Sequence, residues 1–354
     1  MKSTYRAATL AFGALLASSA VQAQSSVTLY GLADASLVWQ NHASNDGGSK
    51  VFMTNGAINH SRFGLIGKED LGGQASAFFQ LESGFNQNDG SMSQSGVIFN
   101  RYALVGLKGN FGTLSAGNIA SPFHNTMILY DPLTIGDYYN TSWWYGTDSG
   151  GKNSISYAYD FGPVHALLDY GVGGVAGSIA RGSQFGASLS FTQNNLSLLA
   201  VYQQTKALTA GGTQRLIGLA GSYAWDKVTF YAGYQNNHDG AGITNSQLNI
   251  IGAPMGTDNV VRKDQGVFAG LTWQVTPTVL LREAYYYDVM HDAMNQSGNS
   301  GTHWTAVSEA EYFFSKRTSV YGQIDYNHTS GAGYVQLPNS NNQMELAVGL
   351  RHWF

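Results

Sequence analysis

Histidine, cysteine, serine and aspartate are the residue types whose spacing could indicate catalysis or metal binding in this chain. The nine histidines are scattered, and none has the HExxH spacing of a zinc site. The chain has no cysteine, which excludes disulfides and thiolate metal sites. No G-x-S-x-G nucleophile turn and no phosphate-binding P-loop is present. We therefore predict no catalytic residue, no metal site and no cofactor, although serine, histidine and aspartate are common enough to keep a hydrolase as an alternative.

The charge composition narrows the function classes further. Only 11% of the residues are charged, well below the usual proportion of about a quarter. The formal net charge is −4, and without Lys2 and Arg6 of the N-terminal segment the chain keeps 16 basic against 22 acidic residues, a net charge of −6. A negative chain of this kind is not expected to bind nucleic acid.

The first 23 residues have the composition of a secretory signal peptide. MKSTYR carries two positive charges, AATLAFGALLASSA forms an apolar core, and the small residues of VQA end at Ala23. We expect cleavage after Ala23, which leaves one mature domain of residues 24–354. No later apolar run approaches the roughly 18 residues of a membrane-spanning helix. The chain is therefore predicted to be exported, and its low charge has to be explained in another way.

Alternation of apolar and polar residues, rather than a helical period, runs from position 27 to the end of the chain. This pattern predicts strands of about ten residues, the length that crosses a bilayer when a strand is tilted. The sixteen predicted strands are 27–39, 58–68, 74–86, 98–108, 111–118, 152–161, 164–173, 184–192, 195–204, 214–225, 227–237, 265–275, 278–289, 302–313, 318–328 and 343–354.

The connections between these segments alternate in length. Short ones, such as GN at 109–110, are followed by long ones rich in Asn, Gly, Ser and Asp, of which 119–151 is the longest at 33 residues. Short turns on one side and long loops on the other are typical of outer-membrane barrels, where closure pairs every backbone group. We predict an all-β, 16-stranded antiparallel transmembrane β-barrel, wide enough to hold an aqueous channel.

The last strand explains why the chain ends on an apolar residue. In MELAVGLRHWF the even-numbered residues from Met344 to Phe354 are mostly apolar, whereas Glu345 and Arg351 lie on the other face. The apolar face is predicted to contact lipid and the polar face to line the lumen. The same parity places Asp34 and Glu82 on the lumen side of their strands as pore-lining residues.

Several stretches of the chain closely resemble the trimeric general porins of β-proteobacteria and Neisseria. These stretches are SSVTLYGLADASL (25–37), SRFGLIGKEDLGG (61–73), NRYALVGLKGNFGTLSAGN (100–118), SKRTSVYG (315–322) and the terminal GLRHWF. The resemblance implies a homotrimer in the outer membrane of a Gram-negative bacterium, through which ions and small hydrophilic solutes diffuse passively. It also implies that the third external loop, here 119–151, folds inward and narrows the pore between basic and acidic side chains.

The resemblance assigns the basic side of this constriction to three residues. Arg62 in SRFGL and Arg101 in NRYALVGL match two positions of the family's basic ladder, with Tyr102 and Leu104 expected to point outward. A third arginine position falls on Gly150, and Lys152 on the same face is expected to substitute for it.

The acidic side is assigned to Asp131 and Asp137, which lie in the middle of the long loop. Asp131 precedes a proline, so the capping of a turn is the alternative role. A fourth basic position of the family is occupied by Asn118. With two basic positions altered and a mature charge of −6, a weak preference for cations is expected, although several relatives prefer anions.

The C-terminus resembles the recognition signal that outer-membrane insertion machinery reads in this family. Phe354, His352 and Gly349 carry that resemblance. The expected partners are thus two further copies of the chain, outer-membrane lipid, the insertion machinery, and the solutes and ions that pass. The alternatives to a channel are a barrel enzyme, such as a hydrolase, and a structural or adhesive barrel with a filled lumen.

Overall fold

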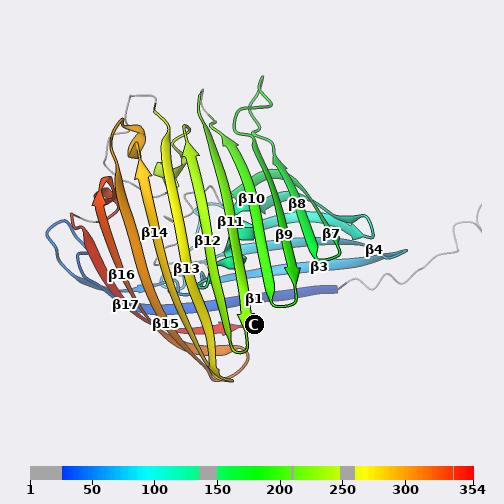
Figure 1. Cartoon of the computed structure of the whole chain (residues 1–354). Helices are drawn as coiled ribbons and strands as arrows, with labels where there is room; N and C mark the ends of the chain where they lie inside the picture. The colour runs from blue at the N-terminus through cyan, green and yellow to red at the C-terminus, as the bar shows by residue number, and fades with distance from the viewer. Residues whose placement is uncertain (1–25, 135–149, 209–210, 248–259, 338) are drawn as a thin grey trace, which may run out of the picture.

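The computed structural model describes residues 26–134, 150–208, 211–247, 260–337 and 339–354 (Figure 1). The predicted signal peptide lies outside the described residues. Within these ranges, seventeen strands form one sheet. They are β1 (Ser26–Gln40), β2 (Lys50–Thr54), β3 (Arg62–Gly72), β4 (Ala75–Gly84), β5 (Tyr102–Gly109), β6 (Gly112–Ala120), β7 (Gly150–Phe161), β8 (Val164–Gly171), β9 (Gln184–Gln193), β10 (Leu196–Lys206), β11 (Thr213–Trp225), β12 (Val228–Asp239), β13 (Arg262–Thr276), β14 (Val279–His291), β15 (Gly301–Phe313), β16 (Thr318–Gly331) and β17 (Asn342–Trp353).

The sheet closes on itself into a barrel (Figure 1). From β3 onward each strand pairs antiparallel with the next, and β17 returns to β1 with Leu32 opposite Trp353. β2 and β3 pair with successive halves of β1, so together they occupy one place in a ring of 16 strands. Closure removes the free edges of the described sheet, which is what allows a sheet to exist in lipid.

The predicted fold class is confirmed, and the predicted strands match those of the structure to within a few residues. The exception is the predicted strand 58–68. The strand begins at Arg62, and β2 forms within the predicted loop 40–57. Both differences have one cause, which is that residues 55–61 leave the sheet.

Alternate side chains point to opposite faces of the wall, as the sequence pattern predicts. In β11, Leu216 and Ala220 are buried, whereas Ile217 and Leu219 are about half exposed. Exposed hydrophobic side chains occur along the other strands too, as expected for a surface in contact with lipid. The opposite face carries most of the polar side chains, including many glutamines, serines and carboxylates. A wall with this polarity separates an aqueous interior from hydrocarbon.

Short helices occur in the long connections. α2 (Pro122–Met127) begins after Ser121, whose hydroxyl accepts a hydrogen bond from the His124 N–H, and it continues into the 3-10 turn η1 (Ile128–Tyr130). Three more short elements are α4 (Ile243–Gln247), η2 (Ala293–Asn295) and η3 (Ala332–Gln336). Among the described residues, no helix has the length and apolar character needed to cross a membrane.

The largest hydrophobic cluster joins the first part of the long connection after β6 to the inward face of the wall. Phe123 and Met127 are fully buried, and burial of such side chains stabilises by about 2 kcal/mol each. Their partners from β10, β11, β13, β14 and β15 are Leu199, Val201, Leu216, Ala220, Phe268, Ala284, Tyr286 and Val307. These contacts hold residues 121–134 against one side of the barrel interior.

Candidate functional site

Arg62 and Arg101 form a basic pair at the start of β3 and just before β5. Arg62 stands opposite Leu32 of β1, which is buried on the inward face, so the pairing agrees with the predicted orientation of Arg62. Glu82 of β4 lies between the arginines, with its Oε1 atom 2.6 Å from Arg101 Nε and its Oε2 atom 4.0 Å from Arg62 Nε. The arginine side chains are 28% and 31% exposed, against 5% for Glu82, so the cluster presents mainly positive groups to water.

Glu82 faces inward, as its parity predicts, but it is not a free lumen charge. The Tyr30 hydroxyl donates to Glu82 Oε2 at 2.8 Å, and Gln80 Nε2 donates to the Tyr30 hydroxyl at 2.8 Å. Arg101 Nε donates to the other carboxylate oxygen of Glu82. Because both oxygens accept hydrogen bonds from protein groups, the carboxylate is not available to ions in the lumen. Its contacts orient the two arginines.

His60 extends the basic cluster by one imidazole. Its ring nitrogen Nδ1 lies 3.3 Å from Asn55 Nδ2, and its backbone carbonyl accepts a hydrogen bond from Arg62. The His60 side chain is exposed beside Arg62 and Arg101. The two arginines supply the fixed positive charge of the cluster.

The predicted outward orientation of Tyr102 and Leu104 is wrong. The Tyr102 hydroxyl donates to Asn125 Oδ1 of α2, inside the barrel, at 2.9 Å. Tyr102 stands opposite Glu82, whereas the neighbouring Val105 and Leu107 are the exposed residues of β5. The reason is that the ladder of β5 begins only at Tyr102, so Arg101 lies before the strand and reaches inward with its long side chain.

Asp131 occupies a turn that fixes the segment 121–134 in place. Its carboxylate accepts hydrogen bonds from the Leu133 N–H at 3.0 Å and from the Tyr286 hydroxyl of β14. Asp131 is only 3% exposed. These contacts correspond to the turn role that the Asp-Pro sequence left open, and they leave little of the charge facing the lumen.

The side chains of two further constriction candidates, Lys152 and Asp137, lie outside the described part of the structure. Lys152 belongs to β7, but its side chain lies outside the described part of the structure. Asp137 lies in the segment 135–149, which is also outside the described residues. Their assignment to the constriction stays a prediction.

Asp34, the second predicted pore-lining residue, is fully buried on the inward face of β1. Its Oδ1 atom accepts a hydrogen bond from the Tyr321 hydroxyl at 2.7 Å, and its Oδ2 atom accepts one from the Asn59 N–H at 3.0 Å. Asp34 therefore joins β1, β16 and residues 55–61, and it presents no free carboxylate.

A network of ion pairs covers the inward face between β14 and β17. Arg282 pairs with Glu309 and with Glu311, whose Oε2 atom is 3.0 Å from Arg282 Nη2. Arg351 pairs with the other oxygen of Glu311. The lumen parity of Glu309, Glu311 and Arg351 can be read from the sequence, but the pairing across strands cannot.

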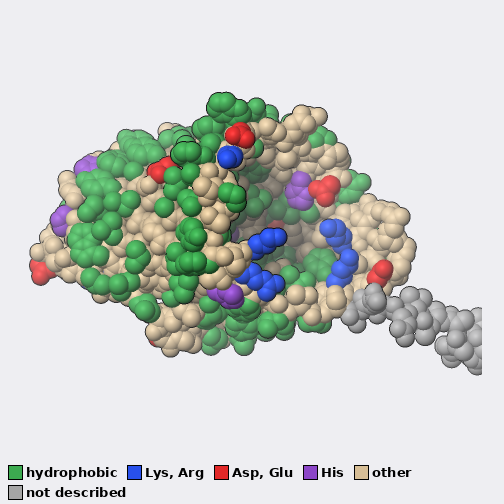
Figure 2. All heavy atoms as spheres, turned by 90° about the horizontal axis from the view of Figure 1, so that it is seen from below, with side chains coloured by type: hydrophobic (Ala, Val, Ile, Leu, Met, Phe, Trp, Pro, Cys, Tyr) green, Lys and Arg blue, Asp and Glu red, His purple; other side chains and the backbone are tan. Residues whose placement is uncertain are grey.

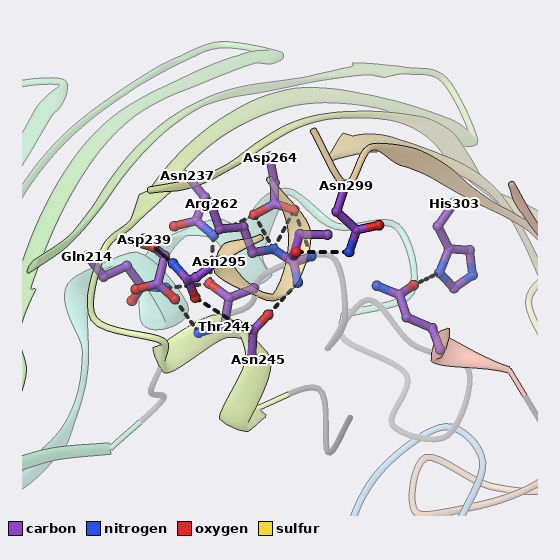
Figure 3. Close-up of polar contacts among 12 residues, drawn as sticks. Gln214, Asn237, Asp239, Thr244, Asn245, Arg262, Asp264, Asn295, Asn299 and His303 are labelled. Carbon is purple, nitrogen blue, oxygen red and sulfur yellow. Dashed lines mark hydrogen bonds and ion pairs between the residues drawn. The ribbon is translucent and has the colours of Figure 1, made fainter. Parts of the chain in front are cut away.

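A second polar cluster holds α4 against the ends of β11, β12 and β13 that adjoin the long loops (Figure 3). Arg262 is 1% exposed and donates to both oxygens of Asp264 at 2.8–3.0 Å and to Asn245 Oδ1 at 2.7 Å. The Thr244 N–H donates to Asp239 at 2.6 Å. No sequence pattern indicates this cluster, because only the register of the strands brings its members together. Within the described ranges, no group of three His, Asp or Glu side chains is arranged to hold a metal.

The C-terminal residues complete the ring of strands. The Phe354 N–H donates to the Gly31 carbonyl at 3.0 Å, and the Gly31 N–H donates to the Phe354 carbonyl at 3.1 Å. Gly349 lies beneath the ring of Tyr321, where any side chain would collide with the ring. His352 faces outward and contacts the Thr318 hydroxyl at 2.9 Å.

Seen from the end opposite the long loops, the barrel has a central hollow with Lys and Arg side chains at its edge (Figure 2). Hydrophobic side chains are spread over the exterior around this hollow in the same view. The model of Gram-negative porins matches residues 7–332 of the chain. The chain belongs to the Gram-negative porin family.

Individual relatives support this assignment of the porin. An outer membrane porin protein of Bordetella pertussis is 32% identical over 279 residues, which cover 68% of this chain and 70% of the relative. The major outer membrane protein P.IB of Neisseria gonorrhoeae is 26% identical over 357 residues, 96% of this chain and 97% of the relative. The solved anion-selective porin from Comamonas acidovorans has the same fold, with a TM-score of 0.76 over 94% of this chain and all of that one at 22% identity.

The porin is thus a multi-pass protein of the Gram-negative outer membrane. The predicted family and location are confirmed. Polar side chains lie on the inward face of the wall. The hollow that they surround is visible from one end of the barrel (Figure 2). This arrangement is the one expected for the wall of a channel.

Proposed function

We propose that the porin forms a water-filled channel for passive diffusion of ions and small hydrophilic solutes. The observation that carries this proposal is a closed wall with an apolar outer face and a polar inner face around a hollow. Purified protein in a planar lipid bilayer is expected to give stable conductance steps. A folded protein that gave no steps but hydrolysed an ester or peptide would favour the enzyme alternative, and one without either activity would favour a structural barrel.

The narrowest part of the channel is proposed to lie beside Arg62 and Arg101. Residues 121–134 fill part of the interior from the side of β9 to β15, and α2 reaches Tyr102 through Asn125. The rest of the long loop, with Asp137, and the side chain of Lys152 are proposed to complete the constriction. Asp131 contributes by positioning the loop, because its carboxylate is buried against Tyr286.

The charge of this constriction supports a preference for anions, opposite to the weak cation preference expected from net charge. Arg62 and Arg101 keep access to water, while Glu82 and Asp131 are almost fully buried and hydrogen-bonded. Accessible fixed charges set which ions enter a pore. The negative formal charge of the whole chain has less effect, since charges more than about 8 Å away are screened at physiological salt.

We propose that three copies assemble through the wall formed by β1 to β6. Exposed tyrosines and tryptophans normally mark where a barrel meets the membrane interface. Among the described residues, they are confined to the chain from β7 onward: Tyr157, Tyr159, Tyr170, Tyr223, Trp225, Trp273, Tyr285, Tyr312, Tyr326 and Tyr334. The wall from β1 to β6 instead exposes aliphatic residues such as Val27, Leu29 and Val105, as expected where another subunit replaces lipid.

We also propose that the porin is cleaved after Ala23 on export and inserted into the outer membrane through a C-terminal signal. Cleavage after Ala23 would leave the new N-terminus close to β1, which begins at Ser26. Phe354, His352 and Gly349 are proposed as the signal read by the insertion machinery. Phe354 is 44% exposed at the seam between the first and last strands, where it is accessible to a partner before the ring closes.

A further inference from the structure

The wall of the barrel is interrupted between β2 and β3. In the pairing with β1, Thr54 stands opposite Ser36 and Arg62 opposite Leu32. Three residues of β1 therefore correspond to the seven residues 55–61, which cannot follow the ladder. We call residues 55–61 the inner turn.

The inner turn folds toward the inside of the barrel. Ala57 and Ile58 are 0% and 2% exposed. They pack in one cluster with Val38 of β1, Tyr321 of β16 and Ala347 of β17. Each of these three wall residues belongs to the inward set of its strand, because the outward neighbours Leu37, Ile324, Leu346 and Val348 are exposed. The inner turn thus covers the interior surface of β1, β16 and β17.

Asp34 and Tyr321 anchor the inner turn through its backbone. Asp34 accepts hydrogen bonds from the Asn59 N–H at 3.0 Å and from the Tyr321 hydroxyl at 2.7 Å. The Tyr321 hydroxyl in turn accepts a hydrogen bond from the Ala57 N–H at 2.9 Å. Ser61 closes the turn, with its hydroxyl 2.9 Å from the Asp34 backbone nitrogen and 3.0 Å from the Asp34 backbone oxygen.

Arg351, Gly349 and Gly56 also help to hold the inner turn in this position. Arg351 donates to Asn59 Oδ1 while it pairs with Glu311. Gly349 leaves room for the Tyr321 ring, and a side chain there would displace the ring from Asp34. Gly56 has a φ of +87°, which favours glycine, and a side chain there would collide with Asp34 and with the Asn59 carbonyl. The hydrogen bonds of Asp34, Tyr321 and Ser61 hold the backbone of the inner turn in one position.

His60 is the exposed residue of the inner turn and lies beside Arg62 and Arg101. We propose that the inner turn narrows the channel from the side of β1, β16 and β17, with His60 in the path of solutes. The inner turn is thus a determinant of size and charge selectivity that is separate from residues 121–134. Those residues pack against another part of the wall, from β9 to β15. This inference rests on the proposed channel function.

The absence of cysteine from the sequence makes the test specific. The variant His60→Cys is to be reconstituted as the assembled porin and treated with a positively or a negatively charged methanethiosulfonate. Attachment is expected to lower the conductance of each open channel, with the cationic reagent raising and the anionic reagent lowering the chloride-to-potassium permeability ratio. Asn45→Cys, an exposed position of the loop between β1 and β2, serves as the matched control and should be labelled without either change.

The outcomes separate this inference from the proposed function. Wild-type protein without conductance would refute the channel itself. Conducting His60→Cys channels in which mass spectrometry finds the introduced thiol labelled but conductance unchanged, or finds it unreactive, would refute the role of the inner turn alone. Should His60→Cys give too little assembled protein, His60→Trp and His60→Ala test the same point, since the larger residue must conduct less than the smaller one.

Discussion

Replacement of Arg62 by alanine tests whether the basic pair determines ion selectivity. Arg62 is the better choice of the two arginines because Glu82 keeps its 2.6 Å contact with Arg101 in the variant. An ion passing about 5 Å from one guanidinium gains or loses about 0.8 kcal/mol in a medium with a dielectric constant of about 80. Screening in about 0.1 M salt, where the Debye length is about 10 Å, reduces this to about 0.5 kcal/mol.

The effect on selectivity is twice this energy, because anion and cation respond with opposite signs. A difference of about 1 kcal/mol corresponds to about a fivefold change in relative permeability. We expect Arg62→Ala to lower the chloride-to-potassium permeability ratio by about that factor, measured as the zero-current potential of bilayers under a KCl gradient.

Two variants control for the loss of side-chain volume and for charge elsewhere. Arg62→Lys keeps the charge and should retain most of the wild-type potential. Lys316→Ala removes an exposed charge from the short turn between β15 and β16 and should have a much smaller effect. If Arg62→Ala and Arg62→Lys both gave the wild-type potential, Arg62 would have no role in selectivity and the constriction would lie elsewhere.

The remaining predictions concern packing and assembly. Phe123→Ala removes a fully buried ring from the cluster under α2, at a cost of about 3–5 kcal/mol, so conductance should become larger and more variable; unchanged channels would mean that this segment does not narrow the pore. Tyr321→Phe leaves the Ala57 N–H without its acceptor, at a cost of about 1–3 kcal/mol, and should raise open-channel noise; quiet channels would contradict an anchored inner turn. Deletion of Phe354 should reduce the heat-modifiable trimer band in outer membranes, and wild-type amounts would exclude a role in assembly.

The strands could be predicted from the sequence because a barrel wall imposes a strict rule on every second residue. β17 is the clearest case, since its outward residues Leu346, Val348 and Leu350 are exposed and its inward residues Glu345 and Arg351 are buried, as alternation requires. The number of strands followed from the same rule together with the alternating loop lengths.

The site could be predicted only in part, because its contacts depend on where strands depart from that rule. Arg101 precedes its strand, so parity gave the wrong side for Tyr102. Residues 55–61 were divided between a loop and a strand, since no periodic pattern indicates a turn that packs inside a barrel. The burial of Asp34 and Glu82 depends on partners such as Tyr321 and Tyr30, which alternation places on the inward face without showing that they meet.

Diffusion through a water-filled pore can be measured as the swelling of liposomes that contain the purified porin. Small uncharged sugars are expected to enter without saturation, and the swelling rate should fall steadily as sugar size increases, because such diffusion is limited by the radius of the solute. The folded state of the inserted protein is checked on the same vesicles by the heat-modifiable band. Folded protein that admits no sugar, or that admits a single sugar with saturable kinetics, would contradict a general diffusion channel.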